Sequence, residues 1–125
     1  MPGSQLGRLS LRADAVYCLV VGLIVAATAP LTTTTVQLPA LVIAAVGSGV
    51  VLWAGVVWWL SFRPLRDGLR LVLAANVLAA SVLAAVSFAA ASIVVLMTFL
   101  AIAIDVGGFA ASQIVALKRM SREAF

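Results

Sequence analysis

Asp105 is the residue whose setting most strongly indicates chemistry, because it is the only charged residue between Leu71 and Leu117. At helical spacing, four small or hydroxyl side chains share its face: Thr98, Ala101, Gly108 and Ser112. Such a face is typical of a tight contact between helices in lipid, so we expect Asp105 to face protein. The structural interpretation is a protonated Asp105 that donates a hydrogen bond to a neighbouring helix. The functional interpretation is a proton-carrying site.

The partner of Asp105 is expected at the same depth along a neighbouring helix. Asp105 lies about 20 Å along a helix from Lys118. The same depth on the other apolar segments falls near Gly22, Gly49 and Ser81, and of these only Ser81 carries a hydroxyl group. We therefore expect Ser81 to be the hydrogen-bond partner of Asp105.

Asp14, Asn76 and Gln113 form a second candidate group, since each lies only a short distance inside an apolar segment. Asn76, for example, lies about 9 Å along a helix from Arg70. The structural interpretation is a hydrogen-bonded knot that fixes the register of three helices. The functional interpretation is a polar entrance, or a binding site for a lipid headgroup or a metabolite.

The residue types of the chain do not indicate a catalytic site or a metal site. The chain has no His, and Cys18 is its single cysteine, which excludes Cys/His zinc sites and disulfide frameworks within one chain. We find no glycine-rich phosphate loop, no nucleophile elbow and no pair of carboxylates at catalytic spacing. We therefore predict that the protein is not an enzyme and has no cofactor or metal. Trp58 and Trp59, just before Arg63, are typical of an interfacial aromatic belt, and Tyr17 and Trp53 lie toward the same half of the predicted spans.

The composition indicates which elements must position these side chains. Of 125 residues, 65% are hydrophobic and 10% are charged, against roughly half and a quarter in a soluble domain. A chain this short has too little polar surface to cover a water-soluble monomer. The sequence therefore predicts an all-α integral membrane protein.

Two long apolar segments, residues 13–62 and 71–117, define the expected spans. Each is far longer than the roughly 20 residues that cross the hydrocarbon core, so each must fold back once. The first break is marked by Pro30, the threonines of 32–35, and Pro39, and the second is weakly indicated near Ser87–Ser92. We expect one transmembrane domain, residues 1–125, with two hairpins of helices at about 13–30, 38–61, 69–88 and 92–117.

The basic residues predict the orientation of these helices. All eight lie on one side of the predicted spans: Arg8, Arg12, Arg63, Arg66, Arg70, Lys118, Arg119 and Arg122. By the positive-inside rule, both termini and the middle loop are cytoplasmic. We interpret the net charge of +4 as a topology signal and a contact with anionic headgroups, not as a nucleic-acid site. A cleaved secretory signal is the alternative for the N-terminal segment, but Asp14 and Pro30 favour a retained helix.

Several short motifs resemble a family of small four-helix membrane proteins of actinobacteria and other bacteria. The matching positions are Arg12, Asp14, Ala15, Gly22, Pro39, Arg63, Pro64, Asn76, Ser81 and Gln113. The resemblance implies a multi-pass protein of a bacterial plasma membrane and no particular activity. The chain departs from the family at Leu78 and Ala79, where a Trp is expected, and at Asp105, where no acid is expected.

Two classes of function follow from these patterns. The first is a structural or accessory membrane subunit, or a small homo-oligomer, that works through helix packing with its own or other membrane proteins. The alternative is a proton-coupled transporter or channel for a small solute that uses Asp105. Small multidrug-resistance transporters have a similar size, but they carry an acid in the middle of the first helix, whereas Asp14 lies at the membrane edge.

Overall fold

The computed structural model describes residues 2–36, 38–87 and 92–123, and these residues form an all-α fold. The helices are α1 (Gly3–Ala27), α2 (Ala29–Val36), α3 (Ala40–Leu60), α4 (Leu65–Ser87) and α5 (Ile93–Glu123). All except the short α2 are long and apolar enough to cross a membrane. The predicted fold class, an all-α membrane protein with four spans, is therefore confirmed.

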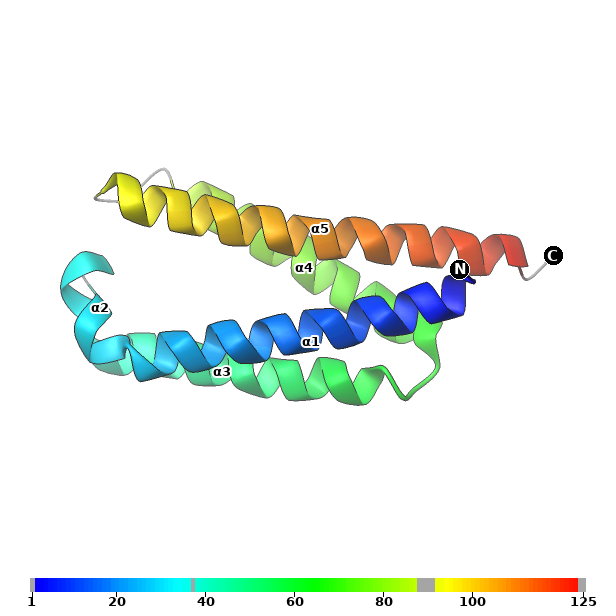
Figure 1. Cartoon of the computed structure of the whole chain (residues 1–125), viewed down its shortest axis with the longest axis horizontal. Helices are drawn as coiled ribbons and strands as arrows, with labels where there is room; N and C mark the ends of the chain where they lie inside the picture. Colours follow the sequence, from blue (N-terminus) through cyan, green and yellow to red (C-terminus); the bar gives the residue numbers. More distant parts are fainter. Residues whose placement is uncertain (1, 37, 88–91, 124–125) are drawn as a thin grey trace.

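The four long helices are arranged as two hairpins (Figure 1). α1 packs along α3, α4 packs along α5, and the hairpins meet mainly through α1 and α5. Figure 1 shows that the hairpins converge at the end that carries both termini and diverge toward the end that carries α2. Contacts between the hairpins are therefore concentrated in the half of the molecule near the termini.

The helices begin and end at different residues from those expected. α1 begins at Gly3 instead of residue 13, α4 at Leu65 instead of residue 69, and α5 continues to Glu123 instead of ending at residue 117. The added turns of α1 and α5 pack on each other, since the Gly3 backbone N–H donates to Glu123 Oε1 at 2.7 Å. Packing between these two ends thus extends the helices beyond the apolar segments.

The first fold-back contains a helix where we expected only a break. α1 ends at Ala27, and the break falls at Thr28, after which Pro30 and the threonines lie inside α2. Pro30 is in the first turn of α2, where a missing backbone N–H is tolerated. For the second fold-back, α4 ends at Ser87 and α5 begins at Ile93, so most of the expected turn and residue 88 lie outside the described residues.

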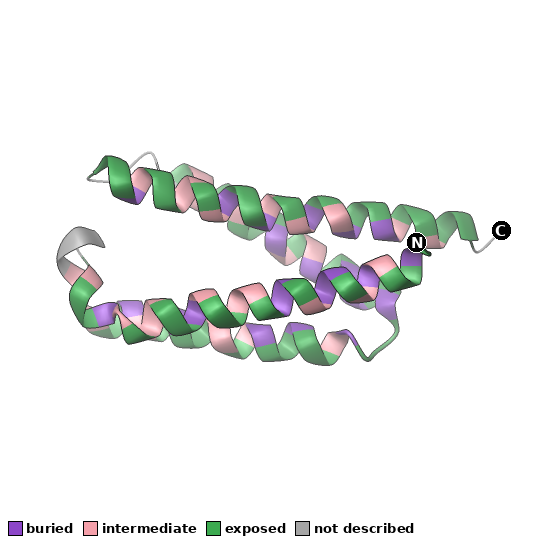
Figure 2. Ribbon diagram, viewed as in Figure 1, coloured by how far each residue is buried: buried purple, intermediate pink, exposed green. Residues whose placement is uncertain are grey.

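The densest packing lies in the half near the termini. Its core consists of aliphatic residues from α1, α3, α4 and α5: Leu11, Ala15, Val57, Leu65, Leu69, Val72 and Ala116. Elsewhere most of the outer surface is exposed (Figure 2). It carries many large apolar side chains, such as Leu41, which is 81% exposed. An apolar outer surface is what a helix bundle in lipid presents to the acyl chains.

Gly22 of α1 and Gly47 of α3 bring the backbones of the first hairpin together. A Cβ added at Gly47 would lie 2.5 Å from the Ala26 backbone nitrogen and 2.8 Å from the Gly22 carbonyl oxygen. Only glycine fits such a contact, which is the usual way that membrane helices approach closely.

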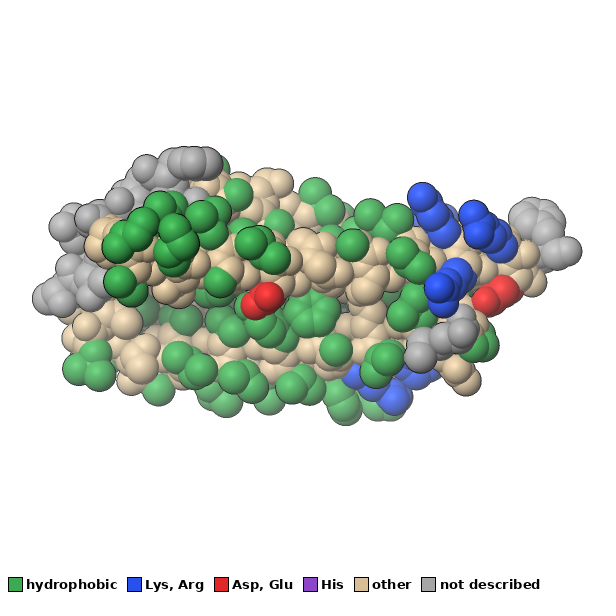
Figure 3. Space-filling model, turned by 45° about the horizontal axis from the view of Figure 1, so that its top comes forward, with side chains coloured by type: hydrophobic (Ala, Val, Ile, Leu, Met, Phe, Trp, Pro, Cys, Tyr) green, Lys and Arg blue, Asp and Glu red, His purple; other side chains and the backbone are tan. Residues whose placement is uncertain are grey.

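Charged side chains are concentrated at the end of the bundle that carries the termini, which we call the basic end (Figure 3). The rest of the face seen in Figure 3 is largely apolar, apart from one acidic side chain midway along it. This separation of charge from apolar surface is that of a multi-pass integral membrane protein.

Candidate site between α1 and α5

Three pairs of side chains join α1 to α5 by hydrogen bonds, in addition to the hydrogen bond from the Gly3 backbone to Glu123. The Ser10 and Ser112 hydroxyl groups lie 2.6 Å apart, Gln113 Nε2 donates to Asp14 Oδ2 at 3.1 Å, and Tyr17 Oη donates to Asp105 Oδ2 at 2.9 Å. Ser10, Asp14 and Tyr17 follow one another at spacings of four and three residues, so they lie on one face of α1. We call these three pairs the polar ladder.

The middle pair of the polar ladder belongs to a buried cluster that also reaches α4. Asn76 Nδ2 donates to Asp14 Oδ2 at 2.7 Å and to Gln113 Oε1 at 3.1 Å, and Cys18 Sγ donates to Asp14 Oδ1 at 3.4 Å. Asp14 and Gln113 are fully buried, and Asn76 is nearly so. The structure thus brings together the three polar residues that the sequence indicated, and the contacts within the cluster suit a knot between helices.

Asp105 lies at the end of the polar ladder that is farther from the termini, and its surroundings differ from those expected. Its partner is Tyr17, not Ser81, whose exposed hydroxyl donates to the Val77 carbonyl of its own helix at 2.8 Å. Tyr17 also packs on Phe109, with ring centroids 5.4 Å apart. Depth along the helix therefore did not identify the partner, because Ser81 is exposed and bonded to its own helix, and the long side chain of Tyr17 reaches Asp105 from α1.

The side chain of Asp105 is exposed on the surface of the single chain, where we expected it to face protein. It lies in a hollow of about 560 Å³ between α1 and α5. The hollow is lined by Leu6, Leu9, Ser10, Ala13, Tyr17, Ile104, Asp105, Gly108, Phe109 and Ser112. This site is therefore an open groove with a carboxyl group, a phenol and two hydroxyl groups on its walls.

The helix face that carries Asp105 is also uncovered. Thr98, Ala101 and Gly108 are exposed, and a Cβ added at Gly107 or Gly108 would meet no atom within 4 Å. Gly49, expected at the same depth, is equally open, in contrast to Gly47. The small residues of α5 thus permit a close approach that no described residue of the same chain makes.

Some residues of the groove were not indicated by the sequence. Ser10 and Phe109 could not be distinguished as site residues, because single hydroxyl and aromatic side chains are common in such a chain. The signal that would have found Ser10 is its place on the same face of α1 as Asp14 and Tyr17. Among the residues that the structure describes, no group of three or more His, Cys, Asp or Glu could hold a metal ion.

The chain matches no known protein family, no curated protein and no solved structure. The resemblance to small bacterial four-helix proteins stays a prediction.

Proposed function

We propose that this integral membrane protein is a structural subunit that assembles with a second copy of itself through the exposed face of α5. One observation carries the proposal: Asp105 is exposed on the single chain, far from the basic end, on a helix that is apolar enough to span the membrane. An acid in the middle of a membrane helix costs about 2.5–3.5 kcal/mol to insert, and such residues almost always face protein or water. One phenol hydroxyl satisfies a single carboxylate oxygen, and a further protein surface would supply a partner for the other.

A second copy of the chain suits this face better than an unrelated helix. In a two-fold dimer whose axis lies along the membrane normal, each residue near the axis meets its own counterpart at the same depth. Asp105 therefore meets the Asp105 of the other copy across the axis. Ala101 and Gly108, which are both exposed and seven residues apart on one face of α5, supply the small surface that permits close helix contact.

Disulfide crosslinking tests this assembly. In a Cys18→Ser background, Gly108→Cys places a thiol on the proposed interface, and oxidation in native membranes should produce a covalent dimer. Gly49→Cys, at an equally open glycine on α3, is the matched control and should remain monomeric. Equal crosslinking of both variants, or of neither, would contradict the proposal.

The groove at Asp105 favours a second candidate, proton-coupled movement of a small solute. The carboxyl group lies on the wall of an open hollow of about 560 Å³, so water and protons can reach it. A carboxyl group packed between helices without water would not be accessible in this way. The pathway would run between copies, since this hollow is open and is not enclosed by the described helices of one chain.

Substitution of Asp105 distinguishes the two candidates. Asp105→Asn keeps a hydrogen-bonding side chain of nearly the same shape but cannot release a proton. For a structural role, the Asn variant should dimerise like the parent, and Asp105→Leu should dimerise less. A flux driven by a proton gradient in liposomes, present in the parent and lost in a stable Asn variant, would instead establish transport.

A further inference from the structure

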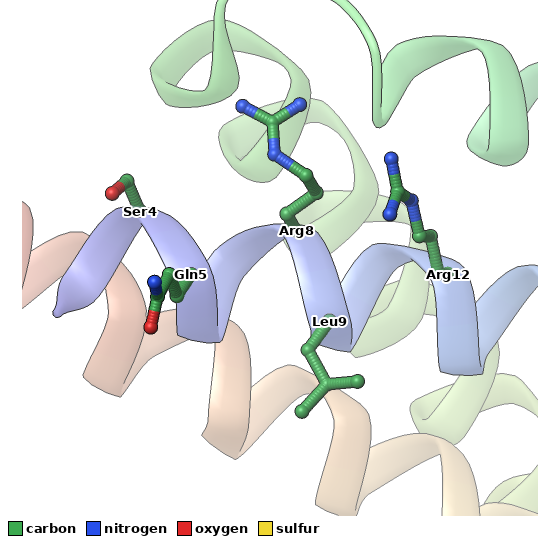
Figure 4. A pocket seen from close by; sticks show the side chains of 5 residues that line it. All are labelled: Ser4, Gln5, Arg8, Leu9 and Arg12. Atoms are coloured by element: carbon green, nitrogen blue, oxygen red, sulfur yellow. The ribbon is translucent and has the colours of Figure 1, made fainter. Parts of the chain in front are cut away.

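Arg8 and Arg12 differ from the other basic residues of the chain in their burial. Both are half-buried, whereas the remaining basic residues are exposed: Arg63, Arg66, Arg70, Lys118, Arg119 and Arg122. The two lie four residues apart on α1, and Figure 4 shows both side chains extending to the same side of the helix. Two positive charges therefore lie next to each other at the basic end.

The connection between α3 and α4 fixes both guanidinium groups. Arg8 Nη1 donates to the Ser61 carbonyl oxygen at 2.5 Å, and Arg12 Nε donates to the Ser61 hydroxyl at 3.5 Å. Ser61 is itself fully buried, and its hydroxyl donates to the Trp58 carbonyl at 2.5 Å. The Arg12 guanidinium also lies 4.8 Å from the ring centroid of Phe62 and 5.8 Å from that of Trp58, which is cation–π geometry. Both groups are thus held in place without a ligand.

The charges of Arg8 and Arg12 are not neutralised within the described part of the chain. Their contacts are with Ser61 and with aromatic rings, and no described carboxylate forms an ion pair with either. Glu123, at the same end, accepts a hydrogen bond from the first amide of α1 at Gly3, so the helix N-terminus is occupied. A guanidinium has five N–H donors, and each of these two uses one on Ser61, which leaves most of them for a ligand.

A hollow of about 270 Å³ adjoins the two arginines. It is lined by Ser4, Gln5, Arg8, Leu9 and Arg12. Ser4 extends to the same side of α1 as the two arginines, whereas Gln5 and Leu9 extend to the other side (Figure 4). Ser4 and Gln5 add neutral hydrogen-bond donors to the lining, and Leu9, which is 55% exposed, adds an apolar wall. A planar guanidinium group can donate two parallel hydrogen bonds to two oxygens of one phosphate. This lining therefore suits a phosphate group attached to an apolar chain.

The hollow lies at the level where lipid headgroups are expected. Trp58 and Trp59, at the end of α3, are about half exposed, and the Trp58 ring centroid lies 5.8 Å from the Arg12 guanidinium that lines the hollow. The Arg63 guanidinium lies 4.4 Å from the ring centroid of Trp59. Tryptophans at the ends of membrane helices concentrate at the headgroup level. A phosphate at this depth belongs to a lipid of the surrounding leaflet.

We infer that Arg8 and Arg12, with Ser4 and Gln5, form a binding site for a phosphate group, and that an anionic phospholipid supplies it. Leu9 lines both this hollow and the groove at Asp105, but none of the four polar residues of the site lines that groove, and the site does not depend on dimer formation. The site holds one lipid next to the connection between the two hairpins. This is a specific contact, unlike the general attraction of basic residues to an anionic membrane surface.

Thermal unfolding of the detergent-solubilised protein tests the site. Short-chain phosphatidylglycerol should raise the unfolding temperature in a saturable manner, whereas the neutral short-chain phosphatidylcholine should not. Arg8→Gln/Arg12→Gln should weaken the apparent affinity by about tenfold or more, because the paired contacts to phosphate oxygens are lost. Glutamine keeps an N–H donor for Ser61. Arg8→Lys/Arg12→Lys retains the charge but loses the planar guanidinium group, so this variant should lose affinity as well.

Arg66→Gln/Arg122→Gln is the matched control, because it removes the same charge from exposed positions at the same end. This control should keep the parent affinity. An equal loss in the control, or an equal effect of the neutral lipid, would overturn the site. Inorganic phosphate as a third probe identifies the source: no effect at concentrations where the lipid saturates supports a lipid site, and an equal effect overturns the lipid assignment.

Discussion

Asp14 is the single side chain on which the packing of three helices depends most directly. It lies on α1 and accepts hydrogen bonds from Asn76 of α4 and Gln113 of α5, while Cys18 binds its second oxygen. The carboxyl group is fully buried. Its removal therefore leaves polar donors without their acceptor in an apolar interior.

Replacement of Asp14 tests this role at the scale of one residue. Asp14→Leu should lower the free energy of unfolding by about 1–2 kcal/mol, the upper range for hydrogen bonds between membrane helices. Asp14→Asn keeps an oxygen acceptor and should lose less. Titration with a denaturing detergent in mixed micelles measures both. Cys18→Ser, which keeps a donor at the edge of the cluster, is the control and should unfold like the parent, whereas a Leu variant of parental stability would show that the cluster is dispensable.

Contacts that depend on the depth of a residue along its helix could be predicted from the sequence, and contacts that depend on the rotation of the helix about its axis could not. The cluster of Asp14, Asn76 and Gln113 followed from depth alone, because polar groups at one level in an apolar bundle must find one another. The partner of Asp105 did not follow, since it depends on how each helix is rotated about its axis. Hydrophobicity gives little information on that rotation when nearly every face of a helix is apolar.

Among the elements, the hairpin of α1 and α3 has the closest backbone contact, at Gly22 and Gly47. The atoms that a Cβ at Gly47 would meet belong to the backbone of α1, which cannot move aside as a flexible side chain can. Gly49 lies on the same helix with nothing within 4 Å of a Cβ. The two glycines are therefore a natural matched pair.

Gly47→Ala should lower the free energy of unfolding by about 1–3 kcal/mol, as overpacking of a tight interior does. Gly49→Ala should leave stability unchanged or raise it slightly, since alanine favours helix more than glycine does. Thermal unfolding of the two variants in one detergent makes the comparison. Equal destabilisation would mean that the effect comes from the helix and not from the contact between helices.

The number and order of the membrane helices could be predicted because long segments without charge leave few alternatives. Their ends could not be predicted to the residue. Residues 3–12 and 118–123 carry polar and charged side chains, and they are helical because α1 and α5 pack on each other there. The helix at residues 29–36 was hidden by Pro30 and the threonines, which the sequence presents as a break.

At the scale of the whole molecule, the basic residues lie at one end and the rest of the outer surface is largely apolar. This arrangement predicts an orientation with both termini and the connection between α3 and α4 in the cytoplasm.

Site-directed labelling checks this orientation. In a Cys18→Ser background, Thr33→Cys should react with a membrane-impermeant thiol reagent added outside cells, and Arg66→Cys should react only after the membrane is opened. Labelling of both positions from outside would contradict the predicted orientation, as would protection of Thr33→Cys combined with reaction of Arg66→Cys.

The wide sequence separation within the buried cluster determines the order in which the molecule can form during synthesis. Asp14 is made long before its partners, since Asn76 follows it by 62 residues and Gln113 by 99. At about 5–20 residues per second, the acid waits roughly 5–20 s for the amide of α5. The close contact between α1 and α3 needs only residues already made, so the first hairpin is complete during that wait. The hydrogen bonds that Asn76 and Gln113 donate to Asp14 therefore form after the first hairpin, and they join it to the second.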